Sequence, residues 1–367
     1  MVKKKIIIVI SGDGWGGAEK QAFLLKEYLG KNFMTEIIWL RDSCDKITMP
    51  FNSSKTAIHY LQNPFQSKQL ILFFLSLTKF WSKLFSLNPY ALISFGNVSN
   101  RASLMIWKFT RVKHFYWNQR DAGLMKVTKA DIFFHKYNTI NYISNSNEGI
   151  KFLKKELHAQ QNNIYFMPNL LENINPKLIK SNYDILKKVK VCMIGNFKKS
   201  KDHKTLIKSF KILNKRLKKH DVDAILYLIG RDAGMKQELK KLIDKMNLNN
   251  FIIFTGWLKN TSKYLHKFDI GVFSSNTEGM PNALIEMMQC GLPIVANKFP
   301  TAKEVIPNEN YKFLSENKNP SDLCEKLYLL IRDKDLRAEN ARFNLDKINR
   351  HLNRFEKYNI PNIQVIN

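Results

Sequence analysis

Cysteine and acidic residues are scarce in this chain of 367 residues, and long uncharged apolar runs are missing. The four cysteines, Cys44, Cys192, Cys290 and Cys324, lie far apart and form no C-x-x-C pair, which argues against a structural zinc site or a disulfide framework. No stretch of about 20 apolar residues is free of charge, so no obvious membrane-spanning helix is expected. The first apolar run is too short for an exported leader and predicts a β-strand. We therefore expect a cytoplasmic protein.

The shortage of acids leaves a strongly basic chain. Lysine and arginine number 59 against 31 aspartates and glutamates, which gives a formal net charge of +28. This excess indicates anionic partners: nucleotide phosphates, lipid diphosphates, an anionic membrane face or nucleic acid. The alternative is a basic surface that serves only solubility. A nucleic-acid-binding protein stays an alternative function, although the sequence has no RNP motif, no zinc spacing and no basic recognition helix.

The length and the pattern of the chain predict two α/β domains. A chain of 367 residues exceeds one ordinary core, and 44% of its residues are hydrophobic. Strands alternate with helices in both halves, which predicts parallel, doubly wound sheets. Ligands of such sheets bind beyond the carboxyl ends of the strands. We expect an amino-terminal domain over 1–172, a linker over 173–188, a second domain over 189–342, and a C-terminal helix and tail over 343–367.

A glycine-rich loop follows the first predicted strand. The stretch SGDGWGGAEK, residues 11–20, contains G-x-G-x-x-G directly after an apolar run, as dinucleotide-binding folds do. A dehydrogenase is therefore one possible function, and Asp42 stands where an acid could bind a ribose. However, Glu19 would crowd the phosphates of a dinucleotide, and this function leaves the second half of the chain unexplained.

The second half carries a more specific pattern in SSNTEGMPNALIEMMQCGLPIVA, residues 274–296. Pro281 suits the first position of a helix and Gly291 its end. The helix start would offer N–H groups and a positive dipole end to a diphosphate. Carboxylates accept hydrogen bonds from sugar hydroxyls, so Glu286 could hold a ribose and Glu278 a donor hexose. The alternative is that Glu286 is a helix-surface acid and Glu278 an N-terminal cap.

The stretch EGMPNALIE resembles the motif of two glutamates separated by seven residues in the retaining glycosyltransferases of family 4. IGNFKKSKDHKTLIKSF, residues 194–210, is similar to the glycine loop, lysine and helix of that family, and GWGGAEKQ to its amino-terminal glycine loop. NYISNSNEGIKFLKK and the following MPN resemble the segment before its linker. The resemblance covers nearly the whole chain. It implies the GT-B fold, with two Rossmann-like domains and a cleft between them.

The resemblance also implies the roles of individual residues in the departure of a diphosphate. Lys201 matches a family lysine at the leaving group, although it could be a solvated loop lysine. The position of the family's arginine holds Asn196, a departure for which Lys198, Lys199 or Arg231 could compensate. The residues implied at the nucleotide-sugar site are Gly16, Gly17, Gly195, Asn196, Gly256, Trp257, Gly279, Met280, Pro281, Asn282 and Glu286.

A second departure lies in HFYWNQRDAG, residues 114–123, where many family members have a histidine followed by an aspartate. Here the pair is Arg120 and Asp121. Arg120 could bind a phosphate or an acidic sugar and Asp121 could orient an acceptor hydroxyl, or the two could form an ion pair that steadies the loop. The catalytic candidates are therefore Glu278, Lys201, Arg120 and Asp121, and the general base stays open.

Neither a metal nor a cofactor is expected. D-V-D at 221–223 is interpreted as a turn, because it precedes a buried strand, and members of the family generally need no metal. The partners that the resemblance implies are a nucleotide diphosphate-sugar donor and a glycan or lipid-linked glycan acceptor. The function expected is transfer of a hexose-type sugar in bacterial surface polysaccharide or lipopolysaccharide synthesis. A sugar-nucleotide epimerase of the same shape, which needs no acceptor, is a further alternative.

The apolar stretch 66–87 bears on the membrane. It contains lysines at 68, 79 and 83 and could lie on an anionic inner leaflet. The interpretation favoured by the sequence is burial of most of this helix against the first sheet. The net charge still favours peripheral attachment at the inner face of the cytoplasmic membrane.

Overall fold

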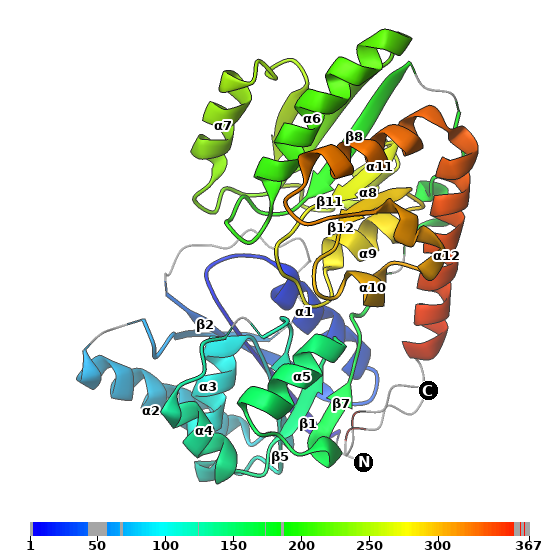
Figure 1. Cartoon of the computed structure of the whole chain (residues 1–367). Helices are drawn as coiled ribbons and strands as arrows, with labels where there is room; N and C mark the ends of the chain where they lie inside the picture. Colours follow the sequence, from blue (N-terminus) through cyan, green and yellow to red (C-terminus); the bar gives the residue numbers. More distant parts are fainter. Residues whose placement is uncertain are drawn as a thin grey trace. The chain divides into compact units, whose positions relative to one another are not determined.

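The computed structural model describes residues 3–42, 57–66, 69–123, 125–172, 174–184, 187–355, 360 and 363. The chain divides into two compact units (Figure 1). One unit takes Met1–Leu170 and Lys357–Asn367, and the other takes Leu171–Glu356. Cys44 lies outside the described residues, and Cys192, Cys290 and Cys324 are buried free thiols.

A sheet of seven parallel strands, counted over the described residues, forms the centre of the first unit. The strands are β1 (Lys5–Ser11), β2 (Met34–Arg41), β3 (Ile58–Gln62), β4 (Ala91–Phe95), β5 (His114–Gln119), β6 (Asn141–Ser144) and β7 (Ile164–Phe166). Their order, β3-β2-β1-β4-β5-β6-β7, reverses direction between β1 and β4. That reversal is the switch point at which open α/β sheets bind ligands.

Helices cover both faces of this sheet, which explains why its central strands are apolar throughout. The helices are α1 (Gly17–Leu29), α2 (Leu70–Leu87), α3 (Asn97–Ile106), α4 (Lys129–Lys136) and α5 (Asn147–Glu156). Phe80 of α2 and Leu153 of α5 share a core with Ile38 of β2. The next residue, Trp39, points to the opposite face, where its ring lies 6.2 Å from that of Phe23 in α1. The helices α2 and α5 therefore face α1 across the sheet.

The second unit repeats the same architecture. Its parallel strands are β8 (Lys188–Ile194), β9 (Asp223–Ile229), β10 (Ile252–Gly256), β11 (Ile270–Phe273), β12 (Ile294–Asn297) and β13 (Leu314–Ser315). Their order, β10-β9-β8-β11-β12-β13, places the switch point between β8 and β11. The loops that leave β8 and β11 are therefore the expected place for a ligand.

Two groups of helices enclose this second sheet (Figure 1). One core contains α6 (His203–Leu217), α7 (Lys236–Lys245) and α11 (Pro320–Arg332). The other contains α8 (Ser262–Leu265), α9 (Asn282–Gln289), α10 (Ala302–Val305) and α12 (Lys334–Phe355). Val191 of β8 belongs to the first core and Cys192 to the second, as expected when successive side chains of a strand point to opposite faces. Short 3-10 helices are η2 (Trp107–Phe109), η3 (Gln161–Asn163), η4 (Pro176–Leu178), η5 (Lys218–His220) and η6 (Asn308–Phe313).

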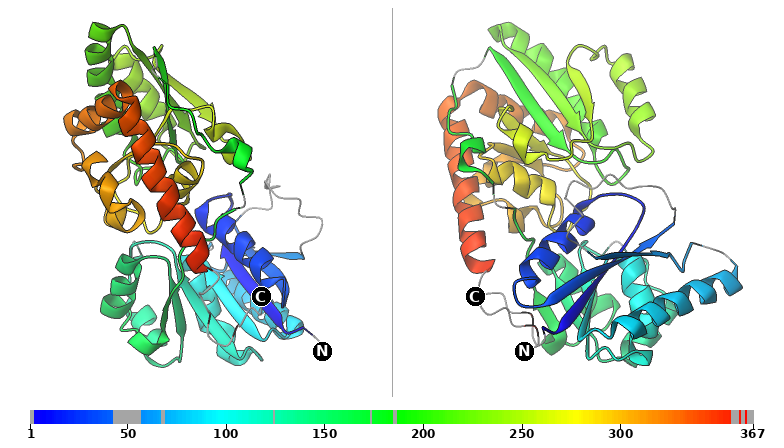
Figure 2. Two further views of the ribbon diagram at one scale, coloured as in Figure 1. Left: turned by 90° about the vertical axis from the view of Figure 1, so that its right-hand side faces the viewer. Right: turned by 180° about the vertical axis from the view of Figure 1, so that it is seen from behind.

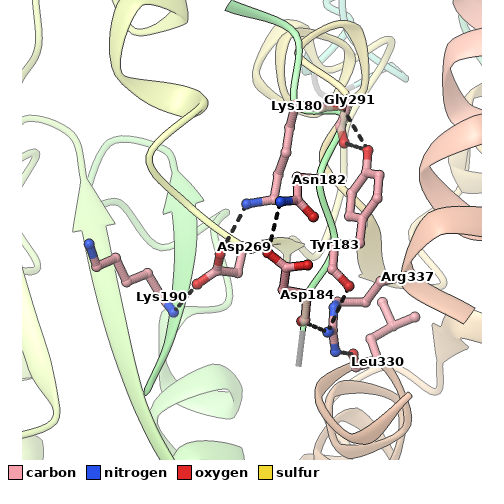
Figure 3. A network of polar contacts seen from close by, with 9 residues as sticks. All are labelled: Lys180, Asn182, Tyr183, Asp184, Lys190, Asp269, Gly291, Leu330 and Arg337. Atoms are coloured by element: carbon pink, nitrogen blue, oxygen red, sulfur yellow. Dashed lines mark hydrogen bonds and ion pairs between the residues drawn. The ribbon is translucent and has the colours of Figure 1, made fainter. Parts of the chain in front are cut away.

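The segment predicted as a linker packs on the second unit over its described residues 174–184 (Figure 3). Lys180 Nζ lies 3.0 Å from Asp269 Oδ1, and the Tyr183 hydroxyl donates at 2.7 Å to a backbone carbonyl just beyond α9. The buried guanidinium of Arg337 donates to backbone carbonyls of this segment and of α11. Ionic and backbone contacts thus hold the segment to the second sheet.

The expectation that most of the helix within 66–87 is buried is wrong. In α2 the residues Ser76, Phe80 and Leu84 are buried, whereas Leu70 is 69% exposed and Ile71 is 75% exposed. Among the described residues, α2 is also the helix with the length and apolar composition of a membrane span, with 18 residues and a mean hydropathy of 1.5.

Candidate functional site

Two loops meet at the switch point of the second sheet. The loop after β8 and the loop after β11 are joined by backbone hydrogen bonds, from Asp202 N to Ser274 O at 3.0 Å and from Asn276 N to Ser200 O at 2.9 Å. A short antiparallel bridge also pairs Lys201 with the residue after Ser274. These bonds fix the position of Lys201 relative to the segment that leads into α9.

Lys201 and Glu278 form an ion pair at this position. Lys201 Nζ lies 2.6 Å from Glu278 Oε1, and their side chains are 10% and 19% exposed. The Ser275 hydroxyl donates to the same Oε1 at 2.7 Å, and the ammonium lies 4.3 Å from the centroid of the Phe273 ring. Burial lowers the pKa of Lys201, and the Glu278 carboxylate opposes this shift. The ion pair therefore holds the Lys201 ammonium in place at the carboxyl edge of the sheet.

The start of α9 lies beside this ion pair. The helix begins at Asn282, and Pro281 is its N-cap with an extended backbone, so the expectation that Pro281 is the first helical residue is wrong by one position. No side chain caps α9, and its first turn has no acid. The Thr301 hydroxyl bonds to the carbonyls of Glu278 and Gly279 and fixes the preceding turn. The positive end of the helix dipole is therefore not neutralised within its first turn, which suits an anion.

Two further predicted residues have defined partners. Glu286 accepts a hydrogen bond from the Thr261 hydroxyl at 2.8 Å, so its carboxylate is oriented and is not a bare surface acid. The guanidinium of Arg231 lies 4.2 Å from the Trp257 ring centroid, and burial lowers the pKa of Arg231. A cation stacked on an indole offers a flat, charged surface. Gly256, the residue directly before Trp257, has φ of +76°, a conformation that favours glycine.

Asn196 has a structural contact that the sequence did not predict. Its Oδ1 accepts a hydrogen bond from the Arg231 backbone N–H at 3.1 Å, so the side chain joins the ends of β8 and β9. The two strands approach closely here, because a Cβ on Gly230 would lie 2.3 Å from the Gly195 carbonyl oxygen. A Cβ on Gly195 would instead lie 3.3 Å from Cε of Lys201. The lysine stem therefore runs over Gly195.

A basic pocket of about 340 Å³ lies next to Lys201. Its lining includes neither Glu278 nor Glu286 nor Trp257, so it adjoins the candidate site without containing it. Lys204 and Glu238 form an ion pair at its wall. The pocket is lined by Lys198, Lys199, Lys201, Asp202, His203, Lys204, Met235, Glu238, Leu239 and Asn276.

In the first unit the glycine loop leads from β1 into α1. Gly16 is the N-cap of α1 and Gly17 its first residue, and the first turn contains Glu19. A Cβ on Gly16 would lie 2.9 Å from a carboxylate oxygen of Glu19, so this acid bends back over the helix start. The negative charge of Glu19 at this helix start would repel the phosphates of a dinucleotide. Asp42 accepts a hydrogen bond from the Asn63 side chain at 2.6 Å.

Arg120 and Asp121 follow β5 and have separate partners. Arg120 donates to the Asn169 side chain and lies 5.7 Å from the centroid of the Phe95 ring. Burial lowers its pKa to about 9, and its Nη1 has no hydrogen-bond partner among the described residues. Asp121 Oδ1 accepts from Gln119 Nε2 at 2.7 Å and from a backbone N–H of its own loop at 2.8 Å. These contacts hold the two side chains by different groups, and the roles expected for Arg120 and Asp121 stay predictions.

The comparisons with known proteins agree with this geometry. Anabaena HepE, solved in complex with UDP-glucose, superimposes with a TM-score of 0.75 at 13% identity, covering 96% of this chain and 98% of HepE. Residues 174–344 match the family profile described as "Glycosyl transferases group 1".

Two glycosyltransferases of known activity are also similar to this chain in sequence. The N-acetylgalactosamine-N,N'-diacetylbacillosaminyl-diphospho-undecaprenol 4-alpha-N-acetylgalactosaminyltransferase of Campylobacter jejuni is 25% identical over 353 residues, which are 91% of this chain and 92% of that protein. The N,N'-diacetylbacillosaminyl-diphospho-undecaprenol alpha-1,3-N-acetylgalactosaminyltransferase of the same organism is 27% identical over 177 residues, or 48% of this chain and 44% of that protein.

The chain is a GT-B glycosyltransferase. The predicted enzyme class and the predicted fold of two Rossmann-like units are thereby confirmed. Membership of family 4 specifically, and the roles of the individual site residues, stay predictions.

Several residues of this glycosyltransferase were missed by reasoning from the sequence. Ser275, Thr261 and Thr301 orient the ion pair, Glu286 and the turn before α9. Ser275 lies within the recognised motif, but the two threonines reach the site only through the fold. Asn169, the partner of Arg120, is 49 residues away from it in the chain. His203 was also missed, although it lies two residues from Lys201.

The buried histidines predict an acid-sensitive fold. His203 in the second unit and His135 in the first both have pKa values lowered by burial from the ordinary 6.5 to about 4. Between these two values the unfolded chain binds more protons, so stability falls as the pH is lowered. From pH 7 to pH 5 each histidine should reduce the free energy of unfolding by about 2 kcal/mol. Thermal melts of His203→Gln and His135→Gln should show a flatter pH dependence than the wild type. An unchanged dependence in both variants would contradict this assignment.

Proposed function

We propose that this glycosyltransferase moves a hexose-type sugar from a nucleotide diphosphate-sugar to a lipid-linked glycan, with retention at the anomeric carbon. In this reaction the bond from C1 to the diphosphate breaks and its electron pair leaves with the diphosphate. An acceptor hydroxyl oxygen forms the new bond to C1 on the same face, and its proton passes to the departing diphosphate oxygen. The observation that carries the proposal is the Lys201–Glu278 pair beside the uncapped start of α9.

Charge at the leaving group is the main requirement of this reaction. Negative charge grows on the departing oxygen, and fixed positive groups nearby stabilise it most when they are shielded from water. Lys201 and the α9 start would supply that charge from the protein itself, so we propose that the reaction needs no metal. Arg231, whose backbone is bound by Asn196, would replace the family's arginine on the donor side. Its guanidinium contacts Trp257, which the resemblance implies at the nucleotide-sugar site.

The remaining donor contacts follow from hydrogen-bonding capacity. Glu286, oriented by Thr261, would accept from the ribose hydroxyls, and Glu278 from a hexose hydroxyl. HepE, which shares the fold, has been solved with UDP-glucose, and this supports a nucleotide-sugar donor.

Arg120 supports an anionic acceptor. Its guanidinium is buried, has one unused nitrogen and contacts the neutral Asn169 amide. A buried cation is costly unless an anion joins it, and an acceptor diphosphate would do so. Both Campylobacter jejuni relatives are named for acceptors that are undecaprenol diphosphates. We therefore propose a role in bacterial surface polysaccharide or lipopolysaccharide synthesis, at the inner face of the cytoplasmic membrane.

Product analysis tests the proposal. The protein is incubated with UDP-, GDP- and ADP-sugars and an undecaprenyl-diphosphate-linked glycan in detergent, and the product is examined by mass spectrometry and by NMR at the new anomeric centre. An α-linked product from an α-donor is expected. A β-linked product would exclude retention, and conversion of the donor sugar without acceptor would indicate an epimerase.

Arg120→Gln tests the acceptor side separately. We expect a KM for the lipid-linked acceptor at least about tenfold higher, since a charge-assisted contact is lost, with unchanged nucleotide binding. Lys113→Gln, an exposed change earlier in the same segment, is the matched control. A loss of nucleotide binding in Arg120→Gln, or an unchanged acceptor KM, would remove Arg120 from the acceptor site.

A further inference from the structure

The helix α2 is apolar on two opposite sides. One side carries the buried Ser76, Phe80 and Leu84, as expected for a helix packed on a sheet. At 100° per residue, Ile71, Phe74, Leu75 and Phe85 lie on the opposite side, together with the polar Thr78 and Ser82. Leu70 and Trp81 lie at the border between the two sides, so six large apolar side chains are exposed outside the buried stripe. Their exposed fractions are 69% for Leu70, 75% for Ile71, 53% for Phe74, 51% for Leu75, 37% for Trp81 and 40% for Phe85. Several large apolar side chains exposed along one helix mark a candidate interaction site.

Neighbouring elements extend this patch within the first unit (Figures 1 and 2). The Trp81 indole N–H donates to the carbonyl of Phe109 in η2 at 2.7 Å, and the Phe109 side chain is 73% exposed. Lys108 donates at 2.8 Å to the carbonyl of Tyr137, just after α4. Tyr137 and Phe133 are each 59% exposed, and their rings lie 4.8 Å apart. These exposed apolar side chains of α2, η2 and the α4 end are called the α2 surface below.

The chain around the α2 surface has charge of one sign. Residues 66–140 contain 11 lysines and arginines and two acids, an excess of 11 − 2 = 9 positive charges. One of the acids, Asp131, is bound by Arg101 at 2.7 Å. The guanidinium of Arg111 lies 4.8 Å from the Phe85 ring centroid, at the edge of the patch. The segment that carries the α2 surface is therefore strongly basic in sequence, and Arg111 places one of its cations beside Phe85.

We propose that the first unit docks on an anionic lipid bilayer through the α2 surface, with α2 lying along the interface. Phe74 and its apolar neighbours would enter the acyl boundary, while Trp81 and the basic residues would remain at the headgroups. The basic excess complements the negative charge of anionic headgroups. The buried side of α2 stays packed on the sheet, so the helix does not leave the fold to do this.

A bilayer fits this chemistry better than a second copy of the chain. A symmetric dimer through the α2 surface would bring two strongly positive regions together, which is electrostatically unfavourable. An anionic membrane supplies the opposite charge and a deformable apolar phase at once. The proposal goes beyond the transfer reaction, because it concerns a surface that contains none of the predicted donor-site residues.

Vesicle sedimentation tests the docking. The full-length protein is mixed with phosphatidylglycerol-containing vesicles and with pure phosphatidylcholine vesicles, with and without high salt. We expect binding to the anionic vesicles that weakens with salt. The double variant Ile71→Glu/Phe74→Glu should lower the partition coefficient at least about tenfold, because it removes apolar burial and adds negative charge. Its melting temperature should stay that of the wild type, because both side chains are exposed.

A matched control separates this effect from general surface change. Ile212→Glu/Ile253→Glu alters two side chains of the second unit, exposed by 40% and 39%, and should bind vesicles like the wild type. An equal loss of vesicle binding in both double variants would overturn the proposal, and so would no binding of the wild type to anionic vesicles. A concentration-dependent dimer that Ile71→Glu/Phe74→Glu abolishes, without vesicle binding, would assign the surface to a second copy. Transfer to acceptor in detergent should be equal in both variants, so docking and catalysis are tested independently.

Discussion

Lys201→Ala is expected to lower kcat/KM by about 2–4 kcal/mol, roughly 30- to 1,000-fold, because it removes the fixed positive charge that we propose for stabilising the departing diphosphate. The ammonium is 10% exposed and held by Glu278 at 2.6 Å, so water cannot easily replace it. Steady-state kinetics with saturating acceptor measure the effect. A rate near that of the wild type would remove Lys201 from the leaving-group site.

Lys199→Ala is the matched control for this change. Lys199 lies in the same loop and lines the adjacent basic pocket, but it makes no ion pair among the described residues, and its loss should cost little activity. The pH profile gives an independent readout. Because burial lowers the pKa of Lys201, its charge is lost at a lower pH than that of an exposed lysine. The decline of kcat/KM at alkaline pH should therefore occur at a lower pH than the pKa of an ordinary lysine. This decline should be absent in Lys201→Ala.

Gly230→Ala is expected to destabilise the second unit by about 2–3 kcal/mol, because the new Cβ would lie 2.3 Å from the Gly195 carbonyl oxygen. The clash would join the new Cβ to a main-chain oxygen, so no side-chain rotation relieves it. Thermal unfolding should show a melting temperature lower by several degrees, since a unit of this size loses about 2–4 °C per kcal/mol. A melting temperature equal to that of the wild type would show that the ends of β8 and β9 are not closely packed.

Gly195→Ala provides the comparison on the other side of the same contact. Its Cβ would lie 3.3 Å from Cε of Lys201, the flexible end of a side chain, so the fold should tolerate it. The lysine stem would have to move by a few tenths of an ångström. We expect Gly195→Ala to leave the melting temperature nearly unchanged and to lower kcat/KM measurably, whereas Gly230→Ala should lower the melting temperature.

The elements of the second half could be predicted well from the sequence. Apolar runs bounded by glycine and proline mark its strands, and the predicted helix Lys204–Lys218 differs from α6 by one residue at each end. The motif also places Glu278 and Lys201 after different strands of one sheet, so their proximity follows from parallel topology. Their contact at 2.6 Å and the role of Ser275 required the structure.

Other features depend on contacts that no local pattern encodes. Strand β3 and helices α3 and α4 were not predicted, because their sequences mix polar and apolar residues without a clear period. Thr261 meets Glu286 from 25 residues away, and the stacking of Arg231 on Trp257 joins the ends of two strands. The exposure of α2 could not be predicted either, since its apolar residues surround the helix and its few polar residues do not gather on one face to indicate which side meets solvent.

We propose that the second unit binds a nucleotide diphosphate-sugar with Lys201, Glu278 and Glu286. The most direct test is a thermal-shift screen of the wild type and Glu286→Ala against UDP, GDP, ADP, their sugar conjugates and NAD. A ligand that binds the native state raises its melting temperature by mass action. We predict a shift with one nucleotide family that is lost in Glu286→Ala, where the ribose contact is missing. No shift with any of these nucleotides beside a clear shift with NAD would contradict the account.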